Sequence, residues 1–180
     1  MDELNRACQS TLTVLAKVRP EQLTSATPCA SWDVRGLVNH FVGTAWWATG
    51  LVSGTRPDHD ETEDLVAAYE ASIEAMTTAF AAEGALERTV AGPNGPLPGI
   101  GLWWLIAGDQ FVHGWDLARA VGLPVDFDPE LSTALLAQAK LSVTDALRGP
   151  DGRAPFGPAQ PTPAGAGPAD ELAAFLGRAV

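Results

Sequence analysis

The chain has 180 residues, 46% of them hydrophobic and 18% charged, which is the composition of a globular domain and excludes an intrinsically disordered chain. Its 22 acidic and 11 basic residues give a formal net charge of −11, which disfavours nucleic acid and anionic membranes as partners. No apolar run is long enough to span a bilayer, and the N-terminus does not resemble a signal peptide. Two cysteines are too few for a disulfide scaffold. We therefore expect a cytoplasmic protein, and we expect its partner to be a small molecule.

Hydrophobic periodicity predicts helices along most of the chain. A first helix is expected over residues 4–18, where Pro20 ends it. A second is expected to begin near Ser31, a favourable N-cap residue, with Asp33 in its first turn. Its apolar positions continue until Gly54.

The middle of the chain alternates helix and loop signals. A third helix is expected to begin within the acidic run 58–64 and to end near Gly84. Residues 90–99 are dense in Pro and Gly and predict a loop. The sequence does not decide whether this loop covers a cleft as a lid. Residues 100–121 then predict a helix that is apolar on nearly every side, which is typical of a central helix or one at a homodimer interface.

The last third of the chain carries two further helix signals. Asp128 is the expected N-cap of a helix that continues to about Arg148. About half of the following residues, up to Pro168, are Gly or Pro and predict an extended segment, before a short helix over 170–176.

These elements predict an all-α architecture without strands or internal repeats. We expect a four-helix bundle domain over residues 1–148. A Gly/Pro-rich tail with a short terminal helix packed on the bundle should occupy residues 149–180.

Polar residues interrupt the apolar face of the helix predicted over 100–121. Asp109 and His113 are four positions apart, about 40° on the helix, and Asp116 shares their face. A buried carboxylate needs a partner, and a divalent cation is one. His40, at the flank of the second helix, is the natural third ligand of a two-histidine, one-carboxylate metal site. Asp116 could then accept the second N–H of His113 from outside the ligand set.

Alternatives stay open at this stage. Asp109 and His113 could form a hydrogen-bonded dyad without metal, with His40 a half-exposed helix residue. Asp116 could instead pair with Arg119. His59, the remaining histidine, lies in an acidic segment and is interpreted as a surface residue.

Other candidate residues are aromatic or thiol side chains. Trp47 and Thr44 are candidates to line a substrate pocket near His40, although the tryptophans as a group are more simply core or interface anchors. Cys8, on an apolar helix face, and Cys29, in a loop, are interpreted as buried or incidental thiols.

Two longer sequence segments resemble a known protein family. The segments TPCASWDVRGLVNHFVG (27–43) and GDQFVHGWDLARAVGLP (108–124) resemble the DinB-like superfamily of metal-binding four-helix bundles. The resemblance is closest to the actinobacterial branch related to the N-terminal domain of mycothiol-dependent maleylpyruvate isomerase. It implies a divalent metal, expected to be zinc, held by His40, Asp109 and His113, with Asp where the isomerase has Glu.

The resemblance also implies chemistry with a low-molecular-weight thiol, such as mycothiol, that approaches the metal. The isomerase carries a second, C-terminal domain where this chain has its Gly/Pro-rich tail, so we do not expect maleylpyruvate isomerisation itself. The sequence therefore predicts a thiol-using transferase or isomerase that acts on a small organic molecule. Two alternatives remain, a metal-dependent hydrolase or deacylase and a non-catalytic binding protein.

Overall fold

The computed structural model describes residues 2–55, 62–93, 95–150 and 152–180. His59 lies outside the described residues. The helices are α1 (Glu3–Leu15), α2 (Val34–Ser53), α3 (Leu65–Ala81), α4 (Gly99–Val121), α5 (Pro129–Ser142) and α6 (Pro168–Phe175). Two short 3-10 turns (Pro20–Gln22 and Asp145–Leu147) and two strands, β1 (Thr89–Gly92) and β2 (Gly95–Pro98), complete the described elements.

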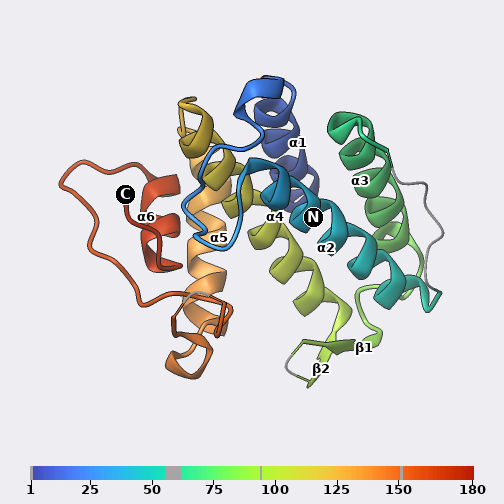
Figure 1. Cartoon of the computed structure of the whole chain (residues 1–180). Coiled ribbons are helices and arrows are strands. Elements are labelled where there is room, and N and C mark those ends of the chain that lie inside the picture. The colour runs from blue at the N-terminus through green and yellow to red at the C-terminus, as the bar shows by residue number, and fades with distance from the viewer. Residues whose placement is uncertain (1, 56–61, 94, 151) are drawn as a thin grey trace.

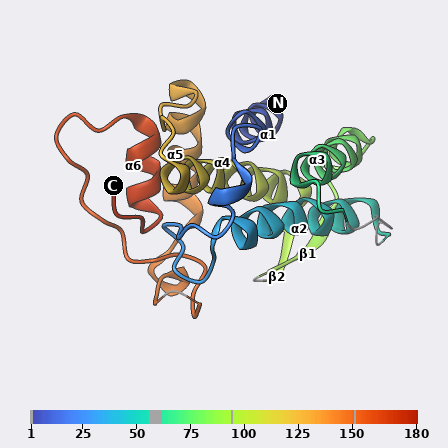
Figure 2. The same cartoon turned by 45° about the horizontal axis from the view of Figure 1, so that its top comes forward.

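Helices α1–α4 contribute to one hydrophobic core. α1 packs chiefly on α4 and α2 chiefly on α3, while α2 also contacts α4 and α1 contacts α3 (Figure 1). α5 and α6 pack on each other and on α4, on the side away from α3 (Figure 2). The mostly helical architecture agrees with the predicted all-α class. Among the described residues, no helix combines the length and the apolar character that crossing a bilayer requires.

The start of α2 differs from the prediction that Ser31 would cap it. Asp33 is the N-cap, and its side chain accepts a hydrogen bond from the Gly36 amide at 2.8 Å. The preceding backbone is held outside the helix by a bridge between Asp33 and Ala26, and by a hydrogen bond from the Val34 amide to the Ser25 carbonyl. Tertiary pairing of the loop therefore decides where α2 begins.

Three other predicted boundaries were wrong. The first helix ends at Leu15 because residues 16–18 form a turn. The third begins after the acidic run, since the carboxylate of Asp64 caps the amides of the first turn of α3. α5 ends at Ser142, where the backbone becomes extended at Val143, and does not continue to Arg148.

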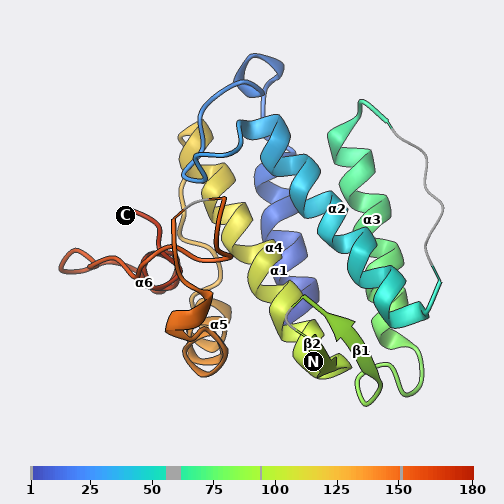
Figure 3. The same cartoon turned by 60° about the horizontal axis from the view of Figure 1, so that its bottom comes forward.

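Residues 90–99 are not an irregular loop, and the prediction that the chain has no strands was wrong. β1 and β2 form an antiparallel hairpin that pairs Thr89 with Pro98 and Gly92 with Gly95. The hairpin lies beside the start of α4 (Figure 3). Val90 of β1 is buried in the core. Both strands have only four residues and β2 contains two prolines, so neither shows a period of two in the sequence.

α4 is buried along most of its length, as its all-round apolar character predicts. Phe111 and Trp115 are fully buried, and the Trp115 indole N–H donates to Asp170 of α6 at 2.9 Å. Part of the apolar surface of α4 is thus covered by the chain's own α5 and α6. Homodimerisation stays a prediction, and Phe111 and Trp115 do not support it.

Candidate metal centre

Three side chains from α2 and α4 converge where these two helices pack together. His40 comes from α2, and Asp109 and His113 lie one turn apart on α4. The Asp109 Oδ1 atom lies 3.5 Å from His40 Nε2 and 3.4 Å from His113 Nε2. The three ligand atoms all lie within 4.8 Å of one another. The structure therefore brings together the three residues that the sequence singled out.

The two oxygens of Asp109 have different partners. Oδ1 faces the two imidazoles, whereas Oδ2 accepts a hydrogen bond from the Thr44 hydroxyl at 2.8 Å. Thr44 also accepts a hydrogen bond from the side-chain amide of Gln110 at 3.1 Å. The hydroxyl of Thr44, a predicted pocket residue, is thus hydrogen-bonded to the Asp109 carboxylate in this structure.

Gln110 connects this arrangement to the core. It is fully buried, its Nε2 atom donates to the Phe41 carbonyl at 3.0 Å, and its Oε1 atom accepts from the Tyr69 hydroxyl at 2.8 Å. A buried amide with partners on both ends has one allowed orientation. Thr44 and Asp109 are therefore positioned by groups from α2, α3 and α4 together.

The other nitrogen of His113 is occupied by Asp116. His113 Nδ1 lies 2.9 Å from Asp116 Oδ2, so its Nε2 atom is left to face Asp109. A carboxylate on the far nitrogen sets the tautomer and ring orientation of a metal-binding histidine. The predicted alternative, a pair between Asp116 and Arg119, is absent among the described contacts, because the Arg119 guanidinium lies over the Trp115 ring at 5.4 Å.

Asp116 pairs instead with Arg178, close to the end of the chain. The Arg178 Nη2 and Nε atoms donate to the two Asp116 oxygens at 2.9 and 3.2 Å. The thiol of Cys29 lies 3.3 Å from Asp116 Oδ2 and 3.6 Å from Arg178 Nη2. Arg178 was missed from the sequence because neither periodicity nor a local motif connects it to α4.

The charges of the cluster shift the pKa values of its members. Burial alone would raise the pKa of Asp109, but the charges and hydrogen bonds of His113 and His40 hold it well below its usual value. Burial would lower the pKa of His113, but Asp109 and Asp116 raise it well above its usual value. Burial would raise the pKa of Asp116, yet the Arg178 charge and the bond to His113 lower it to about 2. The cluster thus favours one positive charge between Asp109 and His113, and a proton or a metal cation can supply it.

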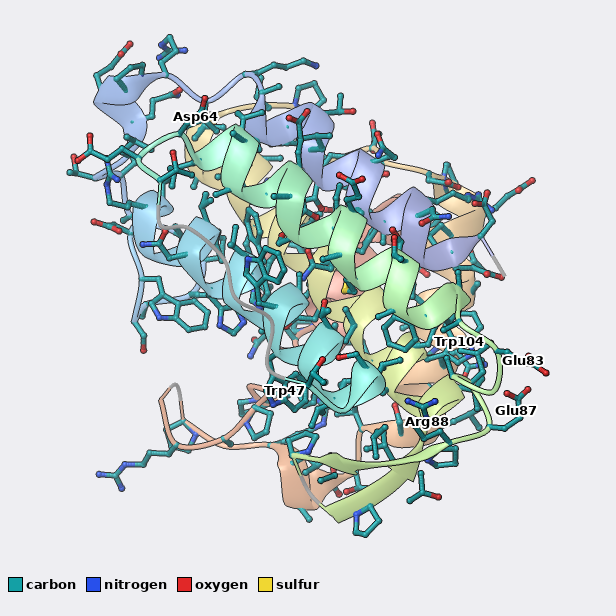
Figure 4. All side chains as sticks on the ribbon, turned by 90° about the vertical axis from the view of Figure 1, so that its right-hand side faces the viewer. Trp47, Asp64, Glu83, Glu87, Arg88 and Trp104 are labelled. Carbon is teal, nitrogen blue, oxygen red and sulfur yellow. The ribbon has the colours of Figure 1, made fainter. Side chains whose placement is uncertain are left out.

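Trp32 forms an aromatic wall beside the cluster. Its ring stacks on His40 with centroids 4.2 Å apart and an interplanar angle of 24°, and it meets His113 edge-on at 5.8 Å. Helical periodicity could not place Trp32 here, since this residue precedes α2. Trp47, the predicted pocket tryptophan, is 38% exposed on α2, below the helix axis in Figure 4, so its role in a pocket stays a prediction.

Two of the three distances between ligand atoms match those around a bound divalent cation. Ligand atoms at about 2.0–2.2 Å from a tetrahedral zinc lie about 3.3–3.6 Å from one another. The distances from Asp109 Oδ1 to the two Nε2 atoms, 3.4 and 3.5 Å, fall in this range. Three protein ligands of these types leave a coordination position for water or a substrate. The His40 side chain is 27% exposed, so the cluster is not completely buried.

Comparison with known proteins shows the family of the chain. A family model described as the mycothiol maleylpyruvate isomerase N-terminal domain matches residues 4–118. The chain belongs to this DinB-like family. The matched range includes His40, Asp109, His113 and Asp116. The match confirms the family resemblance that the two sequence segments indicated.

Two relatives are similar over nearly the whole chain. The uncharacterized proteins Rv0738 and MT0763, from two strains of Mycobacterium tuberculosis, are each 39% identical over 180 residues. The alignment covers 97% of this chain and 95% of each relative, so it extends beyond the family domain into the C-terminal part. No solved structure matches the chain significantly.

Proposed function

We propose that this protein is a divalent-metal-dependent enzyme that uses a small thiol, of the mycothiol type, in a transferase or isomerase reaction on a small organic molecule. His40, Asp109 and His113 hold the metal, which we expect to be zinc, and Asp116 orients His113. The proposal depends on one observation above all, the convergence of three ligand atoms within 4.8 Å in a DinB-like family member.

Several residues would each have a distinct role around a bound cation. A divalent cation bound here would lower the pKa of a coordinating thiol and keep it as the thiolate nucleophile. Thr44 holds the outer oxygen of Asp109, and Asp116 holds the outer nitrogen of His113, so both ligands are pre-oriented. Trp32 covers one face of His40 and limits water on that side of the cluster.

The finer predictions from the sequence belong to the same proposal. α1–α4 would form the DinB-like four-helix bundle, residues 149–180 its packed tail, and Trp47 would line the substrate pocket together with Thr44. We keep homodimerisation and a cytoplasmic location as further expectations. The net charge of −11 favours a small-molecule substrate over nucleic acid.

Metal analysis of the purified protein tests the proposal. We expect about one equivalent of zinc in the wild type and strongly reduced zinc in His113→Ala and Asp109→Asn, with normal helicity by circular dichroism. His59→Ala, at the histidine interpreted from the sequence as a surface residue, serves as the control, and we expect it to keep wild-type metal content. Equal metal content in wild type and His113→Ala would contradict the proposed site.

Turnover assays separate the reaction classes. The zinc-loaded protein is incubated with electrophilic acceptors and esters, with and without added mycothiol or N-acetylcysteine. Thiol-dependent turnover that His113→Ala abolishes supports the proposal. Turnover without thiol identifies a hydrolase, and metal binding without turnover of any kind favours the non-catalytic alternative.

A further inference from the structure

A second group of potential metal ligands lies next to the His40–Asp109–His113 group and shares His113 with it. Cys29, His113 and Asp116 each offer a ligand atom within 4.8 Å of the others. This group already contains a cation, because the Arg178 guanidinium contacts Asp116 at 2.9 Å and lies 3.6 Å from the Cys29 sulfur. The two neighbouring clusters therefore differ in their cation. Cys29 and Asp116 have a guanidinium beside them, whereas His40, Asp109 and His113 would bind a metal ion.

The pairing of Asp116 with Arg178 has a clear physical reason. Asp116 is 0% exposed, and a buried carboxylate with no cation beside it would strongly destabilise the fold. The two-pronged contact of Nη2 and Nε fixes both carboxylate oxygens, which a single point charge would not do. The Asp116 oxygen that pairs with His113 is thereby fixed in direction as well as in charge.

The C-terminal segment is anchored so that Arg178 reaches this point. The Arg178 amide donates to the Ala173 carbonyl at 3.0 Å, and its Nη1 atom donates to the Leu176 carbonyl at 3.1 Å. Asp170 of α6 accepts the indole N–H of Trp115, the neighbour of Asp116 on α4. Two adjacent residues of α4 are thus connected to a segment that lies outside the matched family domain, residues 4–118.

We infer that Arg178 is a positioning residue for the metal centre, and that the C-terminal segment completes this centre through the chain Arg178–Asp116–His113. The inference rests on the proposed function, since it concerns the same site. Among the contacts of the described residues, Arg178 has none with His40 or Asp109. It acts by holding Asp116 in the orientation that keeps His113 Nε2 turned toward Asp109.

Zinc affinity of the full chain, measured by competition with a chelator, tests the inference. Arg178→Gln should bind zinc about tenfold or more weakly, the usual effect of losing an outer partner of a metal ligand. Arg178→Lys keeps the charge but not the two-pronged geometry, so it should recover part of that affinity. Arg148→Gln is the matched control, because Arg148 also anchors the C-terminal segment, at the Phe175 and Gly157 carbonyls, without touching the site.

A second readout does not depend on metal. In the metal-free protein, the Nδ1 proton of His113 should give a protected imidazole signal in proton–nitrogen NMR spectra of the wild type and of Arg148→Gln. This signal should be lost or displaced in Arg178→Gln. A structural role confined to docking of the segment would affect both arginine variants alike.

The outcomes separate the two claims. Arg178→Gln with wild-type zinc affinity and an unchanged His113 signal would overturn the inference, and so would equal losses in Arg148→Gln and Arg178→Gln. Absence of zinc binding by the wild type would defeat the proposed function. In that case, a His113 signal that only Arg178→Gln displaces would still support the positioning role.

Discussion

Gly114 of α4 lies against Thr11 of α1, where a Cβ atom on Gly114 would come within 2.2 Å of the Thr11 hydroxyl oxygen. That hydroxyl donates to the Gln110 carbonyl at 2.7 Å, so it cannot move aside without losing a buried hydrogen bond. The glycine that follows His113 thus allows α1 to approach the part of α4 that carries the site.

Gly114→Ala should therefore destabilise the protein by about 1–3 kcal/mol, the usual cost of overpacking a core. Gly108→Ala is the control on the same helix, because a Cβ there meets nothing within 4 Å. It should be neutral or stabilising by up to about 1 kcal/mol, since alanine favours helix. Chemical denaturation of the three proteins measures both effects. Equal stability of Gly114→Ala and wild type would contradict the close approach of α1 and α4.

The two cysteines should differ in reactivity. Cys8 is 1% exposed, and burial raises its pKa to about 12, so at pH 8 it carries almost no thiolate. Cys29 is only partly buried. Iodoacetamide should alkylate Cys29 alone in the native protein and both cysteines in denaturant, as mass spectrometry would detect. Modification of Cys8 under native conditions would disagree with the packing of α1.

Acid should weaken a contact between α1 and the start of α5. The hydrogen bond from Arg6 lowers the pKa of Asp128, which also caps the Leu131 amide at 3.1 Å. A carboxyl group with a lowered pKa stabilises the fold above its unfolded pKa of about 4, and this contribution is lost as the pH falls through the folded value. Urea unfolding at several pH values should show Asp128→Asn less stable than wild type at pH 7, with a gap that closes toward pH 3. A constant gap would mean that the ion pair contributes nothing.

Stacking of Trp32 on His40 should contribute to metal affinity. Aromatic pairs contribute about 0.5–1.5 kcal/mol, so Trp32→Ala should weaken zinc binding about two- to tenfold, whereas Trp32→Phe should retain most of the affinity. Trp47→Ala serves as the control, since Trp47 has no contact with the three ligands among those described. If Trp32→Ala and Trp47→Ala bind zinc equally well, the stacking has no part in the site.

Much of the helical fold could be predicted from local patterns. The apolar periodicity and the Gly and Pro residues located the six helices of the described part of the chain, and Asp128 was correctly expected to cap α5. The errors lie where tertiary contacts override local preference. Asp33 and not Ser31 caps α2 because the preceding loop pairs with itself, and the hairpin exists because Val90 is buried against the helices.

The site was predictable where its residues share a helix. Asp109, His113 and Asp116 are three or four positions apart on α4, so their common face follows from the helical repeat. Trp32 and Arg178 could not be found in this way. Trp32 reaches His40 from a loop, and Arg178 contacts Asp116 across 62 positions of the chain. Only folding brings such distant residues together.

The central claim is that His40, Asp109 and His113 jointly bind one divalent cation. The most direct measurement is a crystal structure of the zinc-loaded protein with anomalous data collected at the zinc edge. The account predicts a single strong peak at about 2.0–2.2 Å from His40 Nε2, Asp109 Oδ1 and His113 Nε2. A peak among Cys29, His113 Nδ1 and Asp116, or no peak near these residues at a zinc concentration that saturates the protein, would contradict it.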